Sequence, residues 1–149
     1  MLYLEDFAAG DTRTFGAKTV TEMEILAFGR EFDPQYFHTD PEQARGSAFG
    51  GLIASGWHTV SMTCRMFVDN YMNGTSLIGG IGADNVRWLL PVYPGDTLSV
   101  RTTVLAVQRS RSKPDRGSVE IGFETFNQAG AQVLAMKVTA LLGARPPAS

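Results

Sequence analysis

The chain has 149 residues, of which 44% are hydrophobic and 19% charged, a composition that suits one folded domain and argues against a disordered chain. Its 13 basic and 15 acidic residues give a net charge of −2, which provides no electrostatic basis for a nucleic-acid partner. A single cysteine, Cys64, excludes an intrachain disulfide and a zinc site built from several cysteines. The 16 glycines exceed the usual share of about 7%, so we expect close backbone approaches or unusual turns.

No targeting or membrane-spanning segment is predicted. Residues 1–12 contain acidic but no basic side chains, unlike the start of a secretory signal. No apolar run approaches the roughly 18 residues of a membrane span, so a membrane partner is not expected. We therefore expect a cytoplasmic protein with a single domain over 1–149 and a frayed tail at 145–149.

The first predicted elements are a short strand over 13–20 and an amphipathic helix over 22–32. Thr21 and Glu24 have the spacing of a capping box at the start of this helix. Pro34 predicts its end, because proline disfavours a helical conformation of the residue before it.

Two further helices are predicted before the chain changes character. Asp40 as N-cap and Pro41 as the first helical residue indicate a short helix that ends near Gly46. A glycine-rich segment then leads into a helix over 56–72, whose apolar residues form one stripe at helical spacing. The stripe consists of Trp57, Val60, Cys64, Phe67 and Tyr71. Further apolar residues widen it, so we expect this helix to be buried on most sides.

The second half of the chain has the period-two pattern of β-strands. Strands are predicted over 77–90, 96–108, 118–127 and 132–143, and Pro94-Gly95-Asp96 marks one of the turns between them. Helices followed by long strands predict an α+β fold. Such a pattern results when an antiparallel sheet curls around a long central helix.

Asp33 and His38 are the first candidates for chemistry, in the segment between the first two helices. On one tight loop, a carboxylate and an imidazole can converge on one water molecule. The carboxylate then accepts a proton and the imidazole orients the water or returns a proton. A purely structural role, with Asp33 capping a turn and His38 packing or lying on the surface, is the more common explanation of this spacing taken alone.

Ser55 and Gly56 open the long helix, and the first amides of a helix lack intrahelical acceptors. The helix dipole adds positive potential at this end, which can hold an oxyanion such as the enolate of a thioester. Alternatively, the glycines only allow the helix to enter a crowded core. The sequence alone does not decide between the two interpretations.

Taken together, these residues resemble the MaoC-like hydratase/dehydratase family. The family's best-known members are (R)-specific enoyl-CoA hydratases with a hot-dog fold. The resemblance rests on Asp33-x4-His38-x-Asp40-Pro41 and on Gly-Gly-Leu-Ile-Ala-Ser-Gly-Trp-His-Thr over 50–59. The segment 85–98, which contains the Pro-Gly-Asp turn, adds a less specific match. The resemblance covers roughly residues 5–143.

The resemblance implies a hydro-lyase that reversibly hydrates trans-2-enoyl-CoA to (R)-3-hydroxyacyl-CoA. Asp33 would take a proton from water, His38 would hold that water and protonate Cα, and the amide of Gly56 would bind the thioester carbonyl. The substrate would be a thioester of coenzyme A or of acyl carrier protein, with no separate cofactor and no metal. A homodimer or a dimer of dimers is also implied, because the family's active sites use both subunits.

Five further residues are candidates for substrate binding: Ser55, Trp57, His58, Arg109 and Arg111. The bulk of Trp57 could limit acyl length, although core packing is the more common role for the first residue of an apolar stripe. His58 could face the acyl tunnel or be an ordinary helix residue near the site. Arg109 and Arg111 lie in a basic loop that suits the phosphates of coenzyme A, with a solvated hairpin loop as the alternative.

Three positions depart from the family pattern. Gln35 and Tyr36 replace the usual Asn and Pro of the Asp–His loop, and Cys64, a weak donor, stands where some members have a serine. Two alternatives therefore stay open: a hot-dog thioesterase, and a non-catalytic subunit that binds acyl thioesters. Thioesterases of this fold more often place a carboxylate on the central helix, where Asp69 lies close to the predicted end.

Overall fold

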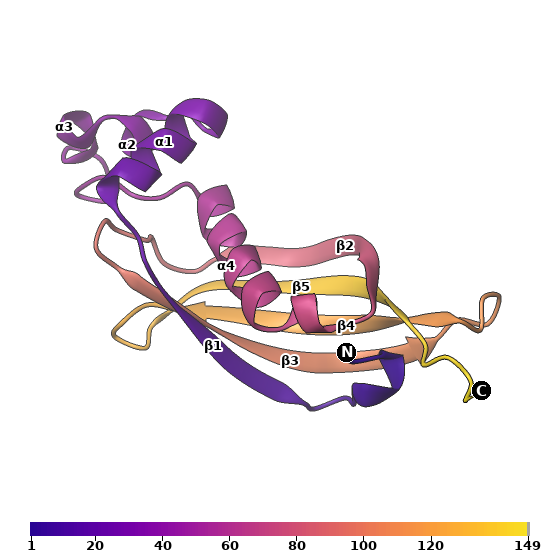
Figure 1. The fold of residues 1–149 in the computed structure, drawn as a ribbon. Coiled ribbons are helices and arrows are strands. Elements are labelled where there is room, and N and C mark those ends of the chain that lie inside the picture. The colour runs from indigo at the N-terminus through magenta and orange to yellow at the C-terminus, as the bar shows by residue number, and fades with distance from the viewer. Residues whose placement is uncertain (149) are drawn as a thin grey trace.

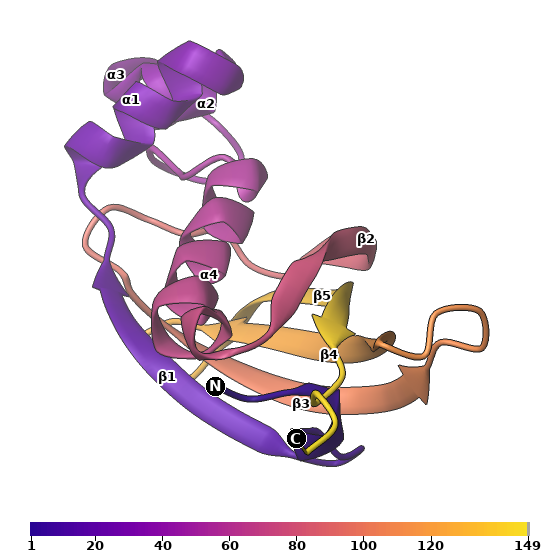
Figure 2. The same cartoon turned by 45° about the vertical axis from the view of Figure 1, so that its right-hand side comes forward.

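A five-stranded antiparallel sheet curves around the longest helix of the chain (Figures 1 and 2). The computed structural model describes residues 1–148. The strands are β1 (Thr12–Thr19), β2 (Leu77–Trp88), β3 (Thr97–Arg109), β4 (Arg116–Phe126) and β5 (Gln132–Gly143), in the order β1-β3-β4-β5-β2. The predicted α+β class and the helix wrapped by an antiparallel sheet are confirmed, and the arrangement is that of a hot-dog fold.

The helices precede most of the sheet in the chain. They are α1 (Glu22–Phe32), α2 (Tyr36–Thr39), α3 (Pro41–Ala44) and α4 (Gly56–Asn70), with 3₁₀ turns η1 (Leu4–Asp6) and η2 (Met72–Gly74). The predicted caps are present: the Thr21 side chain accepts from the amide of Glu24, and the Asp40 side chain accepts from the first amides of α3. The short helix α2, which carries His38, was not predicted.

The core lies between α4 and the concave face of the sheet. Alternate residues of β4 are buried, among them Val119, Ile121 and Phe123. The ring of Phe67 on α4 meets the ring of Phe123 edge to face, with centroids 4.7 Å apart. The buried hydroxyls of Thr63 and Thr125 hydrogen bond to each other across the same interface, at 2.8 Å.

The predicted apolar stripe of the long helix is only partly correct. Trp57 is 56% exposed and Cys64 is exposed, so α4 is not buried on most sides in the single chain. Its buried residues are instead His58, Thr59, Met62, Thr63, Met66 and Phe67. Hydropathy misplaces the buried face for two reasons. Threonine hydroxyls such as that of Thr63 enter the core because they are paired, and the side of α4 next to β2 is not covered by another element.

Strand β2 forms an edge of the sheet and is exposed along most of its length. Its pairing with β5 shifts register at three places. The exposed large apolar side chains of this strand and of the segment after it are Leu77, Ile78, Ile81, Trp88, Leu89 and Leu90. An edge that combines unpaired backbone groups with apolar side chains is a surface for pairing with another chain.

The two ends of the chain meet beside η1. The amide of Arg145 donates to Glu5, and its guanidinium pairs with Asp6. The expected frayed tail at 145–149 is therefore anchored at its first residue, and Ser149 lies outside the described residues. Within residues 1–148, no helix has both the length and the apolar composition required to cross a membrane.

Candidate active site

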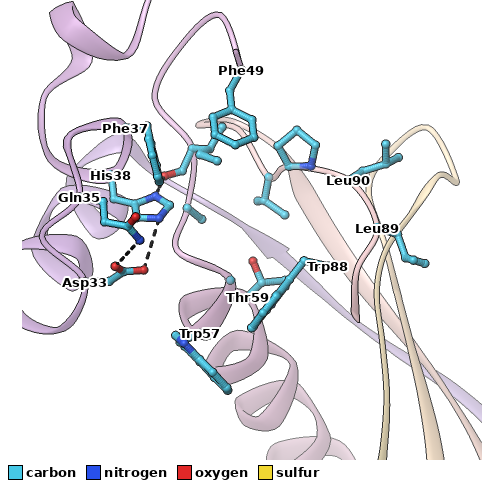
Figure 3. Close-up of a pocket in the computed structure, with 15 residues that line it drawn as sticks. Asp33, Gln35, Phe37, His38, Phe49, Trp57, Thr59, Trp88, Leu89 and Leu90 are labelled. Carbon is cyan, nitrogen blue, oxygen red and sulfur yellow. Dashed lines mark hydrogen bonds and ion pairs between the residues drawn. The ribbon is translucent and has the colours of Figure 1, made fainter. Parts of the chain in front are cut away.

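The close packing of α1 against α2 positions the Asp–His pair. Asp33 is the C-cap of α1, and His38 lies within α2. Gly29 allows the two helices to approach, because a Cβ atom at this position would lie 2.7 Å from the carbonyl oxygen of His38 and 2.9 Å from its Cβ. The side chains of Asp33 and His38 therefore meet at the edge of one cavity (Figure 3).

The imidazole of His38 is buried and held at both nitrogens. Its Nδ1 lies 2.7 Å from the carbonyl oxygen of Ile53, and its Nε2 lies 3.3 Å from Oδ2 of Asp33. Because a carbonyl oxygen only accepts hydrogen bonds, Nδ1 carries a proton. The second nitrogen, Nε2, therefore faces the carboxylate and is the ring atom that can exchange a proton at this place.

The carboxylate of Asp33 accepts two further hydrogen bonds. The Gln35 side-chain amide donates to Oδ1 at 2.8 Å, and the hydroxyl of Ser55 donates to Oδ2 at 2.7 Å. Burial acts to raise the pKa of Asp33, but the bonds from Gln35 and Ser55, with the charge of His38, hold this pKa below its ordinary value. Asp33 is thus an ionised carboxylate that can accept a proton.

Two sequence assignments change in this light. Gln35, which departs from the family's Asn, reaches the carboxylate directly, a contact that the sequence reasoning missed. Ser55, predicted to bind substrate, is fully buried and contacts Asp33 instead of lining the cavity. Its role is to orient the carboxylate, because the chain turns into α4 at this residue and carries the hydroxyl back to Asp33.

Gly56 is the first residue of α4 and lines the same cavity as the Asp–His pair. Within residues 1–148, its amide donates to no protein acceptor. A Cβ atom at Gly56 would overlap the indole of Trp88, so the glycine is required by the close approach of this ring. The free amide at a helix start can donate to an oxygen that gains negative charge.

The cavity has a volume of about 490 Å³ and mostly apolar walls (Figure 3). The apolar wall residues are Phe37, Phe49, Ile53, Ala54, Trp57, Trp88, Leu89, Leu90, Pro91 and Val92. Polar groups enter at one side from Asp33, Gln35 and His38 and at the base from Thr59, a residue that the sequence reasoning did not single out. An apolar space with a few convergent polar groups suits a small organic substrate.

The two residues after Gly56 have different positions. Trp57 packs edge to face against Trp88, with centroids 5.0 Å apart, and lines the cavity, so its expected core role is wrong. His58 stacks on Phe28 of α1 at 4.8 Å and does not line the cavity. Burial lowers the pKa of His58, which favours its neutral form.

The remaining candidates lie away from the cavity within one chain. Arg109 and Arg111 lie on the β3–β4 hairpin, near the Leu77 end of the sheet, whereas the cavity adjoins the Trp88 end (Figure 1). Arg109 donates to Glu5 and to the carbonyl oxygen of Pro114. Cys64 is on the exposed face of α4 and does not line the cavity. In residues 1–148, no group of three or more His, Cys, Asp or Glu side chains is arranged to hold a metal ion.

The chain thus combines a hot-dog fold with an Asp–His pair and a free helix-start amide that line one cavity. A family model described as a MaoC like domain matches residues 6–125, and the chain belongs to this family. It is similar to the crystal structure of a MaoC-like dehydratase from Rhodospirillum rubrum, with 43% identity, a TM-score of 0.90, and 99% of this chain and 100% of the other covered.

Two curated relatives extend the comparison. The chain is 30% identical to the uncharacterized protein YdeM of Bacillus subtilis, over 93% of this chain and 97% of the relative. It is 30% identical to 3-hydroxyacyl-thioester dehydratase Z of Mycobacterium tuberculosis, over 60% of this chain and 61% of the relative. The second relative is thus named for the dehydration of 3-hydroxyacyl thioesters.

Proposed function

We propose that this protein is a cytoplasmic hydro-lyase that reversibly hydrates trans-2-enoyl thioesters to (R)-3-hydroxyacyl thioesters. The observation that carries this proposal is the convergence of Asp33, His38 and the free amide of Gly56 on one cavity. The name of the Mycobacterium tuberculosis relative, 3-hydroxyacyl-thioester dehydratase Z, supports the same substrate class. Coenzyme A or acyl carrier protein is the carrier, and no further cofactor takes part.

The reaction follows from the positions of these groups. Asp33 takes a proton from a water molecule held between it and His38, and the hydroxide adds to Cβ of the enoyl group. His38 donates the proton on Nε2 to Cα, while the amide of Gly56 stabilises the enolate oxygen of the thioester. The proton gained by Asp33 returns to His38 across the 3.3 Å contact between Oδ2 and Nε2. Dehydration is the reverse of these steps.

The geometry favours this reaction over thioester hydrolysis. The carboxylate of the central helix that a thioesterase would use has no counterpart in the cavity, because Asp69 lies near the end of α4 and pairs with Arg65. Both oxygens of Asp33 are instead held toward His38, Gln35 and Ser55. The carboxylate is therefore fixed for proton transfer with the imidazole beside it.

A homodimer joined through β2 is part of this proposal. The strand is an unpaired edge whose apolar side chains Ile78 and Ile81 are 50% and 59% exposed. Two-fold pairing of two β2 edges makes them antiparallel and covers this surface. The Trp57 side of α4 lies next to the same edge, so pairing also shields the mouth of the cavity.

Such a dimer gives the basic hairpin a role in substrate binding. Antiparallel pairing places the β3–β4 hairpin of one subunit at the same end of the joined sheet as the cavity of the other, because the hairpin and the cavity lie at opposite ends within one chain. We propose that Arg109 and Arg111 of one subunit bind the phosphates of the coenzyme A held by its partner.

One assay tests the function. Purified protein is mixed with crotonyl-CoA while the enoyl absorbance in the ultraviolet and the release of free thiol are followed. Loss of absorbance without free thiol supports hydration. Free thiol would identify a thioesterase, and binding without either change would identify a non-catalytic subunit.

A further inference from the structure

Thr59 is a buried residue whose hydroxyl opens to the cavity. The residue is 2% exposed and lines the cavity, and Figure 3 shows its oxygen directed into that space beside Trp88. Within residues 1–148, this hydroxyl makes no hydrogen bond, whereas the Ser61 hydroxyl donates to Trp57 and that of Thr63 pairs with Thr125. A hydroxyl that opens to a mostly apolar cavity and has no protein partner is free to donate to a ligand atom.

The position of Thr59 relative to Gly56 indicates which ligand atom it meets. Residues three apart lie on the same side of a helix, and helical side chains lean toward the helix start. The hydroxyl of Thr59 therefore lies over the first turn of α4, where the amide of Gly56 is also free. Two unpartnered donors thus face the same part of the cavity.

The indole of Trp88 borders this part of the cavity. The ring occupies the space in which a Cβ atom of Gly56 would lie. Figure 3 shows the same ring beside Thr59. Trp57 packs against the outer side of the same ring. A hydrogen bond made beside these apolar rings lies in less polar surroundings than bulk water, which strengthens it.

We propose that the hydroxyl of Thr59 is a second donor to the thioester carbonyl, an inference that rests on the proposed function. A carbonyl oxygen has two lone pairs, so it accepts from the amide of Gly56 and from Thr59 at the same time. As the oxygen becomes enolate-like, both bonds strengthen while the hydroxyl keeps its proton. Thr59 is therefore a catalytic residue that stabilises the transition state.

The experiment compares two substitutions at Thr59 with a control on the same helix. Thr59→Val removes the hydroxyl at nearly constant shape and should lower kcat for crotonyl-CoA by roughly 10²-fold to 10³-fold. Thr59→Ser keeps the hydroxyl and should stay within about tenfold of the wild type, since one methyl group is lost. Ser61→Ala removes an exposed hydroxyl on the opposite side of α4 and should leave kcat unchanged. Thr59→Ala replaces Thr59→Val if the latter does not fold.

A second readout does not depend on turnover. Butyryl-CoA carries the same thioester but cannot be hydrated, and the infrared carbonyl stretch of its bound form reports hydrogen bonds to the oxygen. The stretch should move to higher frequency in Thr59→Val and remain at the wild-type frequency in Thr59→Ser and Ser61→Ala. A frequency that is equal in all four proteins overturns the proposal, as does an equal loss of kcat in both Thr59 variants.

The outcomes separate this inference from the proposed function. If the wild type does not hydrate crotonyl-CoA but the carbonyl frequency of butyryl-CoA depends on Thr59, the hydratase activity is rejected and the contact to the carbonyl stands. If the wild type neither hydrates crotonyl-CoA nor binds butyryl-CoA, both are rejected.

Discussion

The imidazole of His38 faces the carboxylate of Asp33 with Nε2 and Oδ2 3.3 Å apart, while its other nitrogen donates to the carbonyl of Ile53. This arrangement fixes which nitrogen can exchange a proton with substrate. The ring cannot turn over without losing the bond to Ile53, so its acid–base chemistry is confined to Nε2.

Removing either member of this pair should abolish hydration without unfolding the protein. Asp33→Asn and His38→Ala should each lower kcat for crotonyl-CoA by about 10²-fold to 10⁴-fold, because each loses one proton transfer. Stopped assays with each variant at equal concentration measure the loss, and circular dichroism checks the fold. Near-wild-type rates in both variants would reject the mechanism.

Gln35→Ala should move the acidic limb of the pH–rate profile to higher pH. The Gln35 amide donates to the carboxylate and helps to lower the pKa of Asp33, so its removal raises that pKa. Asp33 acts as a base only when ionised, and a higher pKa means that activity is lost at a higher pH as the solution is acidified. The profile of kcat/KM for crotonyl-CoA between pH 5 and pH 9 measures the shift.

The matched control is Gln43→Ala, which removes an exposed amide side chain on α3 outside the cavity. Its profile should coincide with that of the wild type. An acidic limb that stays in place in Gln35→Ala would show that the amide does not tune the carboxylate.

Gly29→Ala should damage the site from outside the cavity. The added methyl group would overlap the backbone of His38, and overpacking of this kind costs about 1–3 kcal/mol. We expect a lower free energy of unfolding together with a lower kcat, because α2 must move and carries His38 away from Asp33. Gly46→Ala is the control, since its methyl group would meet only the carbonyl oxygen of Gln43, at 3.6 Å. Equal stability and activity of the two variants would contradict the packing argument.

Ile81→Lys should convert the dimer to a monomer. The side chain is 59% exposed on the β2 edge, and a lysine there would be buried without a partner on pairing. Light scattering at micromolar concentration should give twice the chain mass for the wild type and the chain mass for the variant. Leu105→Lys, on the exposed side of β3, should remain a dimer. A monomeric wild type would reject the proposed interface.

Arg109→Ala combined with Arg111→Ala should weaken binding of acyl-CoA and reduce its dependence on salt, because fewer phosphate charges are neutralised. Calorimetric titration with butyryl-CoA at two ionic strengths measures both effects. Butyryl-pantetheine, which lacks the nucleotide phosphates, is the control and should bind both proteins alike. Unchanged affinity for butyryl-CoA would remove the hairpin from the proposed binding site.

The sequence predicted the strands well because their apolar residues alternate, as in β4, where alternate positions are buried. It also predicted both helix caps, since each depends on residues that are neighbours in the chain. The burial of α4 could not be read in the same way. Hydropathy predicts Trp57 in the core and Thr63 at the surface, whereas the structure shows the opposite. The hydroxyl of Thr63 is buried because it pairs with that of Thr125, which lies on a distant strand.

The site was predictable only as far as the family pattern reached. Asp33, His38 and Gly56 follow that pattern, and all three line one cavity. The contacts of Asp33 with Gln35 and Ser55 depend on how tightly α1 packs on α2, which no local motif encodes. The place of Thr59 on the cavity wall was missed, because a threonine within a helix carries no signal that it faces a cavity.

The indole of Trp88 occupies the place of the side chain that Gly56 lacks. The two positions are far apart in the sequence, yet the residue type allowed at one depends on the residue type at the other. A homologous chain that acquires a side chain at the first position must lose the ring at the second, and one that loses the ring gains space beside the helix start. The space beside the helix start can therefore change during evolution through this pair while the Asp–His loop is left untouched.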